Sequence, residues 1–206
     1  MNGSKHNKPV IAAFDFDGTL TRHDTLLPFL WHVAGPAKFI YKSILLSPVF
    51  AGYALKLIRN DIAKIKVLQS FLRGLSISLL QPLAREFAAS TLPNFLRPSA
   101  MRQLEWHKQQ GHRCILVSAS LELYLQPWAE KCGFDDVLCS SLEIGENGIT
   151  TGRLSGENCF GPEKLQRLEN LLGRLSDYTV YAYGDSRGDR ELLAAADHAY
   201  YRYFKD

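Results

Sequence analysis

Three short hydrophobic runs stand out along the chain, at residues 10–14, 114–117 and 179–183. None of them alternates cleanly between polar and apolar positions, which is typical of β-strands that are covered on both faces of a sheet. A weaker run of the same kind covers residues 136–139. The pattern therefore predicts three buried strands and a fourth, weaker one.

Helical patterns separate these strands. They cover residues 121–131, the segment from Pro162 to Gly173, and residues 188–196. Proline suits the first turn of a helix and glycine suits its exit, so both ends of the second helix are marked. Strands that alternate with helices predict an α/β fold with a Rossmann-like, doubly wound and mostly parallel sheet.

Two further strand signals lie towards the C-terminus. Residues 142–144 and 149–151 predict a hairpin, because the Asn147-Gly148 pair between them favours a tight primed turn. The aromatic run at 200–204 predicts a last strand at the edge of the sheet.

Residues 31–89 have a different character. The segment is helical in pattern, holds most of the long apolar stretches, and contains no strand-like run that ends in an acidic residue. It predicts a helical cap domain at 31–89, inserted into a core domain formed by 9–30 and 90–206. A chain of 206 residues is long enough for one substantial core with a small insertion. The polar residues 1–8 predict a flexible arm.

Composition changes this picture little. The net charge is +3, and the lysines and arginines are scattered, so nothing favours a nucleic-acid partner. The apolar stretch from Val10 stops at Asp15, which is too short for a secretory signal. The four cysteines have neither metal-binding nor C-x-x-C spacing, which indicates reduced, structural thiols and a cytoplasmic protein.

Acidic and hydroxyl side chains follow the predicted strands. Asp15 and Asp17 come after the first strand, and Ser118 comes after the second. Asp185 and Asp189 come after the third. The carboxyl ends of parallel strands lie along one edge of a sheet, so these residues are expected to converge there. Four converging carboxylates need a hard divalent cation, and oxygen ligands beside a phosphate point to Mg²⁺.

The positions of the acidic residues indicate their roles. Asp15 ends the first strand and can attack phosphorus in line, which gives an aspartyl-phosphate. Asp17 points to the same side and can act as general acid to the leaving group, then as general base to water. Asp185 would bind the metal directly, and Asp189, one helical turn later, would bind the metal or its water.

The phosphate group has its own candidate ligands. Gly18 and Thr19 permit a tight turn whose backbone N–H groups face the phosphate. Ser118 offers a hydroxyl donor, and Lys164 brings a positive charge that offsets the phosphate and the nucleophile. Each signal alone has an ordinary structural alternative, such as a turn, a helix cap or a surface lysine. Their joint occurrence at the strand ends favours the catalytic interpretation.

The same residues carry a resemblance. The segments 14–20 (FDFDGTL), 117–120 (VSAS) and 184–189 (GDSRGD), together with Lys164, resemble the four-motif signature of the haloacid dehalogenase superfamily. The D-x-D-G-T-L form of the first motif implies a phosphatase or phosphotransferase. The insertion between the first two motifs resembles the helical C1 cap of the phosphoserine-phosphatase-like branch, subfamily IB. The resemblance covers about residues 9–199.

The resemblance also implies residue roles. In this superfamily the first aspartate is the nucleophile, and the second is the acid and base and lends a backbone carbonyl to magnesium. These roles fall on Asp15 and Asp17. Metal binding falls on both of them together with Asp185 and Asp189.

The substrate is less well specified. Asp24 resembles the acidic residue that faces the substrate amine in phosphoserine phosphatases, and it can equally cap the helix that begins near Thr25. Lys66 is the nearest counterpart of their cap arginine, but it lacks the bidentate fork of arginine. The Ser-Ala-Ser sequence at 118–120 also departs from their glycine-rich second motif. Phosphoserine is therefore not favoured as the substrate.

Residues 43–55 form a thirteen-residue stretch without charge, flanked by Lys42 and Lys56. The stretch is shorter than the ~20 apolar residues that span a bilayer. One interpretation is the buried core of two cap helices. The other is an apolar surface that contacts the membrane interface or accepts a lipid-like leaving group. Some capped members of this branch resemble phosphatidylglycerophosphate phosphatases, whose caps carry a comparable stretch.

The sequence therefore predicts a magnesium-dependent phosphomonoester hydrolase that acts through an aspartyl-phosphate on a small or lipid-linked phosphate ester. The alternatives are a phosphoserine-type phosphatase, a phosphotransferase, a membrane-associated phospholipid phosphate phosphatase, and a non-catalytic phospholigand-binding module. Loss of Asp15 or Asp17 would favour the binding module, and both are present. The expected location is the cytoplasm, with the membrane surface as the alternative.

Overall fold

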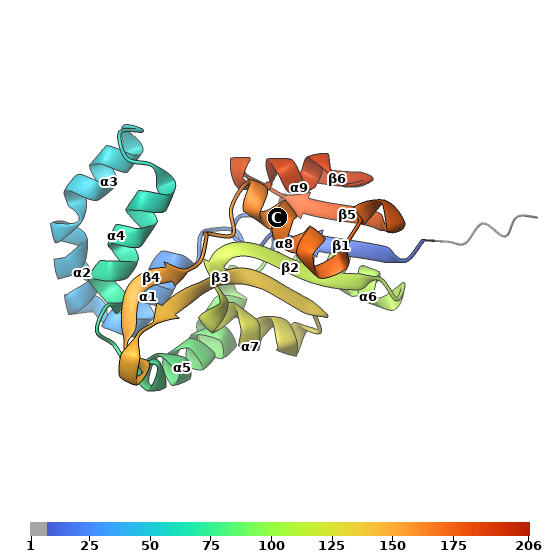
Figure 1. Ribbon diagram of the computed structural model, residues 1–206. Coiled ribbons are helices and arrows are strands. Elements are labelled where there is room, and N and C mark those ends of the chain that lie inside the picture. The colour runs from blue at the N-terminus through green and yellow to red at the C-terminus, as the bar shows by residue number, and fades with distance from the viewer. Residues whose placement is uncertain (1–7) are drawn as a thin grey trace, which may run out of the picture.

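A six-stranded sheet runs through the centre of the molecule, with helices on both of its faces (Figure 1). The computed structural model describes residues 8–206, so the arm predicted at 1–8 lies almost wholly outside the described residues. The strand order is β4-β3-β2-β1-β5-β6, and neighbouring strands are parallel except for β3 and β4. The strands are β1 Val10–Phe14, β2 Arg113–Leu121, β3 Asp136–Ile144, β4 Thr150–Ser155, β5 Thr179–Gly184 and β6 His198–Tyr201.

The predicted core strands are confirmed, and β3 is longer than predicted. It continues past the predicted fourth strand and becomes the first arm of the hairpin with β4. The primed turn is present, because Asn147 and Gly148 have φ values of 58° and 72°. The N–H of Ile149 donates to the carbonyl oxygen of Glu146 at 3.3 Å across this turn. The edge strand predicted at 200–204 begins two residues earlier, as β6.

Alternate residues of the central strand pack against different helices. Ala12 and Phe14 belong to the core on one face of the sheet, and Ile11 and Ala13 belong to the core on the other. The first face is covered by α6 Pro98–Gln109 and α7 Glu122–Cys132, and the second by α8 Pro162–Leu172 and α9 Arg190–Ala194. Both faces of β1 are therefore buried, which explains its unbroken apolar sequence and confirms the doubly wound α/β fold.

The helix predicted at 188–196 differs in its first turn. The chain forms a 3₁₀ turn at Arg187–Asp189 and only then continues as α9. The hydroxyl of Ser186 accepts from the N–H of Gly188 at 3.1 Å, and the carboxylate of Asp189 accepts from the N–H of Ser186 at 3.0 Å. This capping box tightens the turn and brings the Asp189 side chain back towards the strand end.

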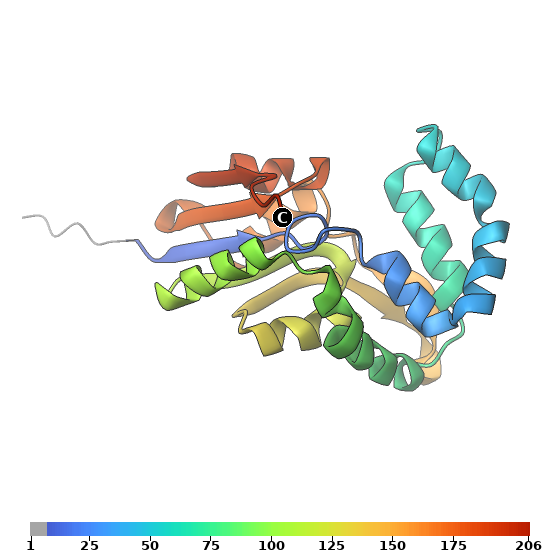
Figure 2. The ribbon, with the colours of Figure 1, turned by 180° about the vertical axis from the view of Figure 1, so that it is seen from behind.

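Residues between β1 and α6 are mainly helical, as predicted. The helices are α1 Leu26–Ala34, α2 Pro36–Leu45, α3 Ser47–Ala54, α4 Asn60–Leu72 and α5 Ile77–Glu86, followed by a π turn at Phe87–Thr91 and a 3₁₀ turn at Leu92–Phe95. In both views α2, α3 and α4 stand to one side of the sheet, whereas α5 lies along α7 (Figures 1 and 2). The division into a cap at 31–89 and a core at 9–30 and 90–206 stays a prediction.

The hairpin ties α4 to the sheet. The N–H of Gly74, just after α4, donates to the carbonyl oxygen of Thr150 at 2.9 Å, and the N–H of Thr150 donates back to Leu75 at 2.8 Å. Gly152 has a φ of +73°, and a Cβ there would lie 2.6 Å from the Cα of Gln69. Only glycine allows β4 to approach α4 this closely.

Two further expectations concern the cysteines and the membrane. All four cysteines are free thiols, and three of them are buried, in agreement with a structural role. Across residues 8–206 we find no helix with the length and apolar character needed to cross a bilayer.

Candidate active site

The carboxyl ends of β1, β2 and β5 meet at one edge of the sheet, where a cleft of about 870 Å³ opens towards α3 and α4. The cleft is lined by seven of the residues predicted for the site: Asp15, Asp17, Gly18, Asp24, Ser118, Lys164 and Asp185. Thr19 and Asp189 lie directly behind it, each hydrogen-bonded to a residue of the lining. The structure therefore brings these side chains together where the strand order predicts.

A buried lysine organises the carboxylates. The Nζ of Lys164 donates to Oδ1 of Asp15 at 2.5 Å and to Oδ1 of Asp189 at 2.6 Å. The hydroxyl of Thr19 donates to the other oxygen of Asp15 at 2.9 Å. All four residues are buried. Asp15 is therefore held in one orientation by two donors from different elements.

Burial and charge pull the ionisation of these groups in opposite directions. Burial raises the pKa of Asp15 to about 6, although the charge of Lys164 lowers it. Burial also acts to raise the pKa of Asp189, but the charge and hydrogen bond of Lys164 outweigh this effect and hold that pKa below its usual value. The two carboxylates in turn outweigh burial at Lys164 and raise its pKa. The lysine is therefore the fixed positive charge of the site.

Three carboxylates form a candidate metal centre. Asp15, Asp185 and Asp189 each offer an oxygen atom, and these atoms all lie within 4.8 Å of one another. A set of carboxylate oxygens fits a hard divalent cation such as Mg²⁺. The carboxylate of Asp17 lies outside this group, so metal binding by Asp17 stays a prediction for its backbone carbonyl.

The loop after β1 approaches the metal centre closely. Gly18 has a φ of +81°, and a Cβ there would lie 2.3 Å from Oδ2 of Asp185. Within the loop, the N–H of Gly18 donates to the hydroxyl of Thr21 at 3.3 Å, and the N–H of Thr19 donates to Phe16 at 3.2 Å. These two N–H groups therefore stabilise the turn itself, which differs from the expectation that they face a phosphate.

Asp17 is held separately from the metal centre. Its Oδ1 accepts from the N–H and the hydroxyl of Thr25 at 2.8 and 2.7 Å, and its Oδ2 accepts from the hydroxyl of Ser120. Burial raises the pKa of Asp17 to about 7, and the nearby charge of Asp24 adds to the shift. A carboxyl group in this range can both give and take a proton near neutral pH.

Thr25 and Ser120 were not predicted as site residues. Ser120 lies two positions after Ser118 in β2, and side chains two apart in a strand point to the same face, so this spacing was an available signal. Ser118 itself is buried at the cleft, where its oxygen accepts from the N–H of Ser120 at 3.1 Å. Its hydroxyl hydrogen is therefore free to donate to a phosphate.

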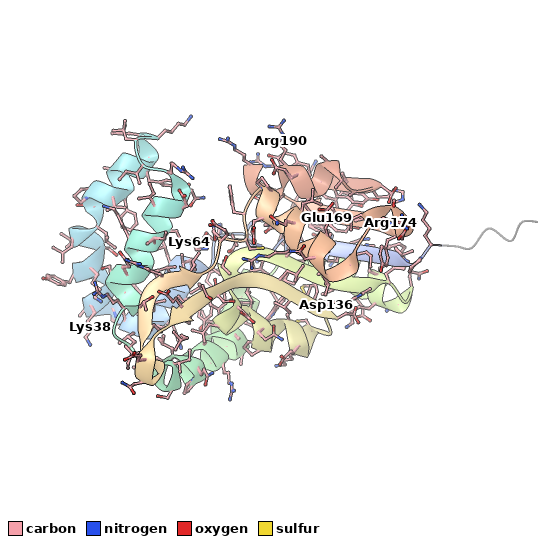
Figure 3. The ribbon with its side chains drawn as sticks, viewed as in Figure 1. Lys38, Lys64, Asp136, Glu169, Arg174 and Arg190 are labelled. Atoms are coloured by element: carbon pink, nitrogen blue, oxygen red, sulfur yellow. The ribbon has the colours of Figure 1, made fainter. Side chains whose placement is uncertain are left out.

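The structure places a different cap lysine in the cleft. Lys66 is exposed and lies outside the cleft lining, whereas Lys64 lines the cleft. Two residues span about 200° around a helix, which explains why Lys64 and Lys66 lie on opposite sides of α4. Lys64 lies on the side of α4 that faces the sheet (Figure 3). Its Nζ donates to the carbonyl oxygen of Ala119 and, at 2.6 Å, to Oδ1 of Asn158. Burial lowers the pKa of Lys64 to about 8.

The two interpretations of Asp24 are compatible. Its Oδ1 accepts from the N–H of Leu26 at 2.9 Å, so it caps the start of α1. It also lines the cleft, as a residue that contacts substrate must.

The apolar stretch at 43–55 is only partly buried. Leu46 is buried, and Phe50 and Tyr53 line the cleft. Ile44 and Leu55 are 65% and 69% exposed, so the stretch is not simply a core between two cap helices.

The fold and the site together define an α/β protein that carries a cluster of aspartates at the carboxyl ends of its strands. The family model for haloacid dehalogenase-like hydrolases matches residues 12–194, and the chain therefore belongs to this family. This confirms the family that the sequence resembles, and with it the expectation of an enzyme.

Three similar proteins give the family context. The chain is 35% identical over 205 residues to the protein CicA of Caulobacter vibrioides, covering 100% of this chain and 91% of CicA. It is 27% identical over 114 residues to a histidinol-phosphatase of Neisseria meningitidis, covering 53% and 51% of the two chains. A solved phosphoserine phosphatase with an analogue of the phospho-aspartyl intermediate superposes with a TM-score of 0.61 at 20% identity, covering 92% and 84%.

Proposed function

We propose that this protein is a magnesium-dependent phosphomonoester hydrolase that forms an aspartyl-phosphate on Asp15. The observation that carries the proposal is the arrangement at the end of β1. Asp15 is oriented by Lys164 and Thr19, and Asp17, two residues later, is a separately held carboxyl group with a pKa of about 7. The first group suits a nucleophile and the second suits an acid and base.

The reaction proceeds in two steps. A carboxylate oxygen of Asp15 bonds to phosphorus while the bond from phosphorus to the leaving oxygen breaks, and Asp17 gives its proton to that oxygen. In the second step a water molecule attacks phosphorus, Asp17 takes a proton from the water, and the bond to Asp15 breaks. Inorganic phosphate is released and both aspartates return to their starting state.

Asp15, Asp185 and Asp189 would hold Mg²⁺, with the backbone carbonyl of Asp17 as a further ligand. Magnesium supplies positive charge next to the phosphoryl oxygens. Lys164 and the hydroxyl of Ser118 add a second charge and a hydrogen-bond donor on the protein side.

The substrate proposed is a small or lipid-linked phosphate ester. The side of the cleft formed by α1, α3 and α4 is largely apolar, with Leu26, Leu27, Pro28, Phe50, Tyr53 and Val67 in its lining. Lys64 adds a positive charge among them. Histidinol-phosphatase and phosphoserine phosphatase among the similar proteins support a phosphate monoester. A cytoplasmic location and peripheral membrane contact through 43–55 belong to the same proposal.

Phosphate release from a panel of esters tests the function. The panel contains an aryl phosphate, phosphoserine, histidinol phosphate, sugar phosphates, nucleotides and phosphatidylglycerol phosphate, each with Mg²⁺ and with EDTA. We expect Asp15→Asn to lower kcat by about 10³-fold or more, because the nucleophile is lost. Asp177→Asn is the matched control, because Asp177 is an exposed aspartate just before β5, at the opposite end of this strand from Asp185. Absence of activity in the wild-type protein across the panel would overturn the proposal.

A further inference from the structure

Helix α2 and the turn from α3 to α4 carry a concentration of exposed apolar side chains. Seven of the seventeen exposed large hydrophobic residues of the described chain lie between Ile40 and Leu57. Six of them form what we call the outer cap face: Ile40, Tyr41, Ile44, Leu45, Leu55 and Leu57. On α2 they recur three and four residues apart, which places them on one side of the helix. An apolar patch of this kind on a folded chain marks a surface that meets a partner.

The turn from α3 to α4 forms the tip of this face. Leu55 and Leu57 are 69% and 79% exposed, and they flank Lys56, which has a φ of +59°. The N–H of Leu57 donates to the carbonyl oxygen of Gly52 at 2.8 Å, so the turn is closed by the backbone. In Figures 1 and 2 this turn lies at the upper end of the group formed by α2, α3 and α4. Two leucines are therefore held in solvent at the edge of the molecule.

The charge of the outer cap face has one sign. Residues 25–60 contain no aspartate or glutamate, and their basic residues are Lys38, Lys42, Lys56 and Arg59. Arg59 is paired with Asp61 at 2.9 Å. Among residues 8–206, Lys38 and Lys56 make no ion pair. Figure 3 labels Lys38 at the margin of the molecule, beside α2. Apolar side chains with unpaired lysines suit an anionic lipid surface.

The outer cap face is next to the cleft. Phe50 and Tyr53 line the cleft from α3, the same helix whose last turn leads to Leu55. Tyr53 is itself 48% exposed and so lies where the cleft meets the surface. A molecule anchored under the outer cap face would have a short apolar route into the cleft.

We propose that the outer cap face docks on an anionic lipid bilayer, with Leu55 and Leu57 inserted at the interface and Lys38 and Lys56 facing the lipid headgroups. This proposal rests on the proposed phosphatase function, because docking through this face would bring the cleft close to phosphate esters held in the bilayer. A second copy of the chain suits the face less well. In a two-fold interface the unpaired lysines of the two copies would face each other, and residues 25–60 supply no carboxylate between them.

Vesicle sedimentation tests the docking. The full chain is mixed with phosphatidylcholine vesicles that contain or lack phosphatidylglycerol. We expect binding only to the anionic vesicles, weakened by added salt. Leu55→Ser with Leu57→Ser should lower the partition coefficient about tenfold or more, and Lys38→Glu with Lys56→Glu should have an effect of similar size.

A matched control separates this outcome from a general loss of exposed apolar residues. Leu79→Ser with Leu171→Ser changes two exposed leucines elsewhere, on α5 and α8, and should leave binding unchanged. All variants should hydrolyse a soluble aryl phosphate at the wild-type rate, since none of these residues lines the cleft. If the wild type does not hydrolyse the aryl phosphate, the proposed function is wrong. Vesicle binding is measured separately and tests the docking alone.

Three results overturn the docking proposal. The first is equal sedimentation of the wild type with anionic and neutral vesicles. The second is unchanged binding of both outer-face variants. The third is a concentration-dependent dimer in sedimentation velocity that Leu55→Ser with Leu57→Ser dissociates, which would assign the face to a second copy of the chain.

Discussion

Lys164 donates to both Asp15 and Asp189 from a side chain that is only 2% exposed. Two carboxylates and one ammonium group are therefore removed from water together. Such a group is stable only while its charges compensate one another, and the loss of one partner leaves an uncompensated buried charge. The same lysine thus has a structural role in the absence of substrate, in addition to the phosphate-binding role that we propose for it.

Lys164→Met should therefore destabilise the metal-free protein. We expect the free energy of unfolding to fall by about 3 kcal/mol in EDTA, because Asp15 and Asp189 then repel each other without a cation. Addition of Mg²⁺ should recover more stability in the variant than in the wild type, because the metal replaces the missing charge. Urea unfolding with EDTA and with Mg²⁺ measures both effects. Lys131→Met, at an exposed lysine of α7, is the control and should change neither.

Most of the site residues that could be predicted from the sequence lie at strand ends. Asp15, Ser118 and Asp185 each follow an apolar run, and parallel strands deliver such positions to one edge. Lys64 could not be found in this way, because it reaches the cleft from a helix whose orientation depends on packing. Lys66, which the sequence predicts instead, is exposed and lies on the side of α4 that faces away from the cleft.

At the scale of elements, the contact between β4 and α4 depends on one glycine. Gly152→Ala introduces a Cβ at 2.6 Å from the Cα of Gln69, in a residue with a φ of +73°. Gly156→Ala is a close control, because its φ is +76° and nothing lies within 4 Å of the added atom. We expect both variants to lose about 1 kcal/mol through the backbone, and Gly152→Ala to lose a further ~2 kcal/mol through the clash. Thermal unfolding of the two variants, measured in parallel, gives the contribution of the close contact between β4 and α4. Equal losses of stability in the two variants would contradict this contribution.

A second element contact joins α6 to β5 through buried rings. Nε2 of His107 lies 2.9 Å from the hydroxyl of Tyr183, and its Nδ1 lies 2.7 Å from Nδ1 of His112. Burial, together with the neighbouring His112, lowers the pKa of His107 from 6.5 to about 4. The folded state therefore holds His107 neutral.

This contact makes stability depend on pH with a definite sign. Between pH 6.5 and about 4 the unfolded chain binds a proton at His107 that the folded chain does not, so acidification favours unfolding in this window. Between pH 7 and pH 5 the wild type should lose about 2 kcal/mol more than His107→Gln, which keeps a hydrogen-bonding side chain without titrating. Urea unfolding at the two pH values gives the difference. The same pH dependence in both proteins would exclude His107 as its source.

At the scale of the whole molecule, Lys64 links helix α4 to the residues at the edge of the sheet. It donates to Ala119, which lies between Ser118 and Ser120, and to Asn158, which also accepts from Ser140 at 3.0 Å. One side chain of α4 therefore contacts both the strand end and the loop that leads to α8.

Lys64→Met should lower kcat/KM about tenfold, because charge-assisted hydrogen bonds of this kind contribute roughly 1.5–3 kcal/mol. Lys66→Met, two residues along the same helix but exposed, should be indistinguishable from wild type. Steady-state kinetics with a substrate from the ester panel measures both. If Lys66→Met is the variant that loses activity, the assignment of Lys64 to the cleft is wrong.

The fold as a whole was more predictable than the arrangement of its helices. Apolar runs over 10–14 and 179–183 specify buried strands through their own composition, and connection rules then set the sheet. The Asn147-Gly148 turn could also be predicted, because this pair of residues favours a primed turn through its own backbone preferences. The course of residues 31–89 was not, because amphipathic helices do not encode which neighbour they meet. The half-exposed stretch at 43–55 is the clearest example.

The length of β3 has a consequence for the evolution of specificity. Because β3 begins in the core sheet and ends in the hairpin that supports α4, its length sets the distance between the aspartates at the strand ends and α4. A relative with two residues more or fewer in each arm of this hairpin would keep the same aspartates but hold α4 at a different distance from them. Changes in the hairpin would then select longer or shorter leaving groups without any substitution in the site itself.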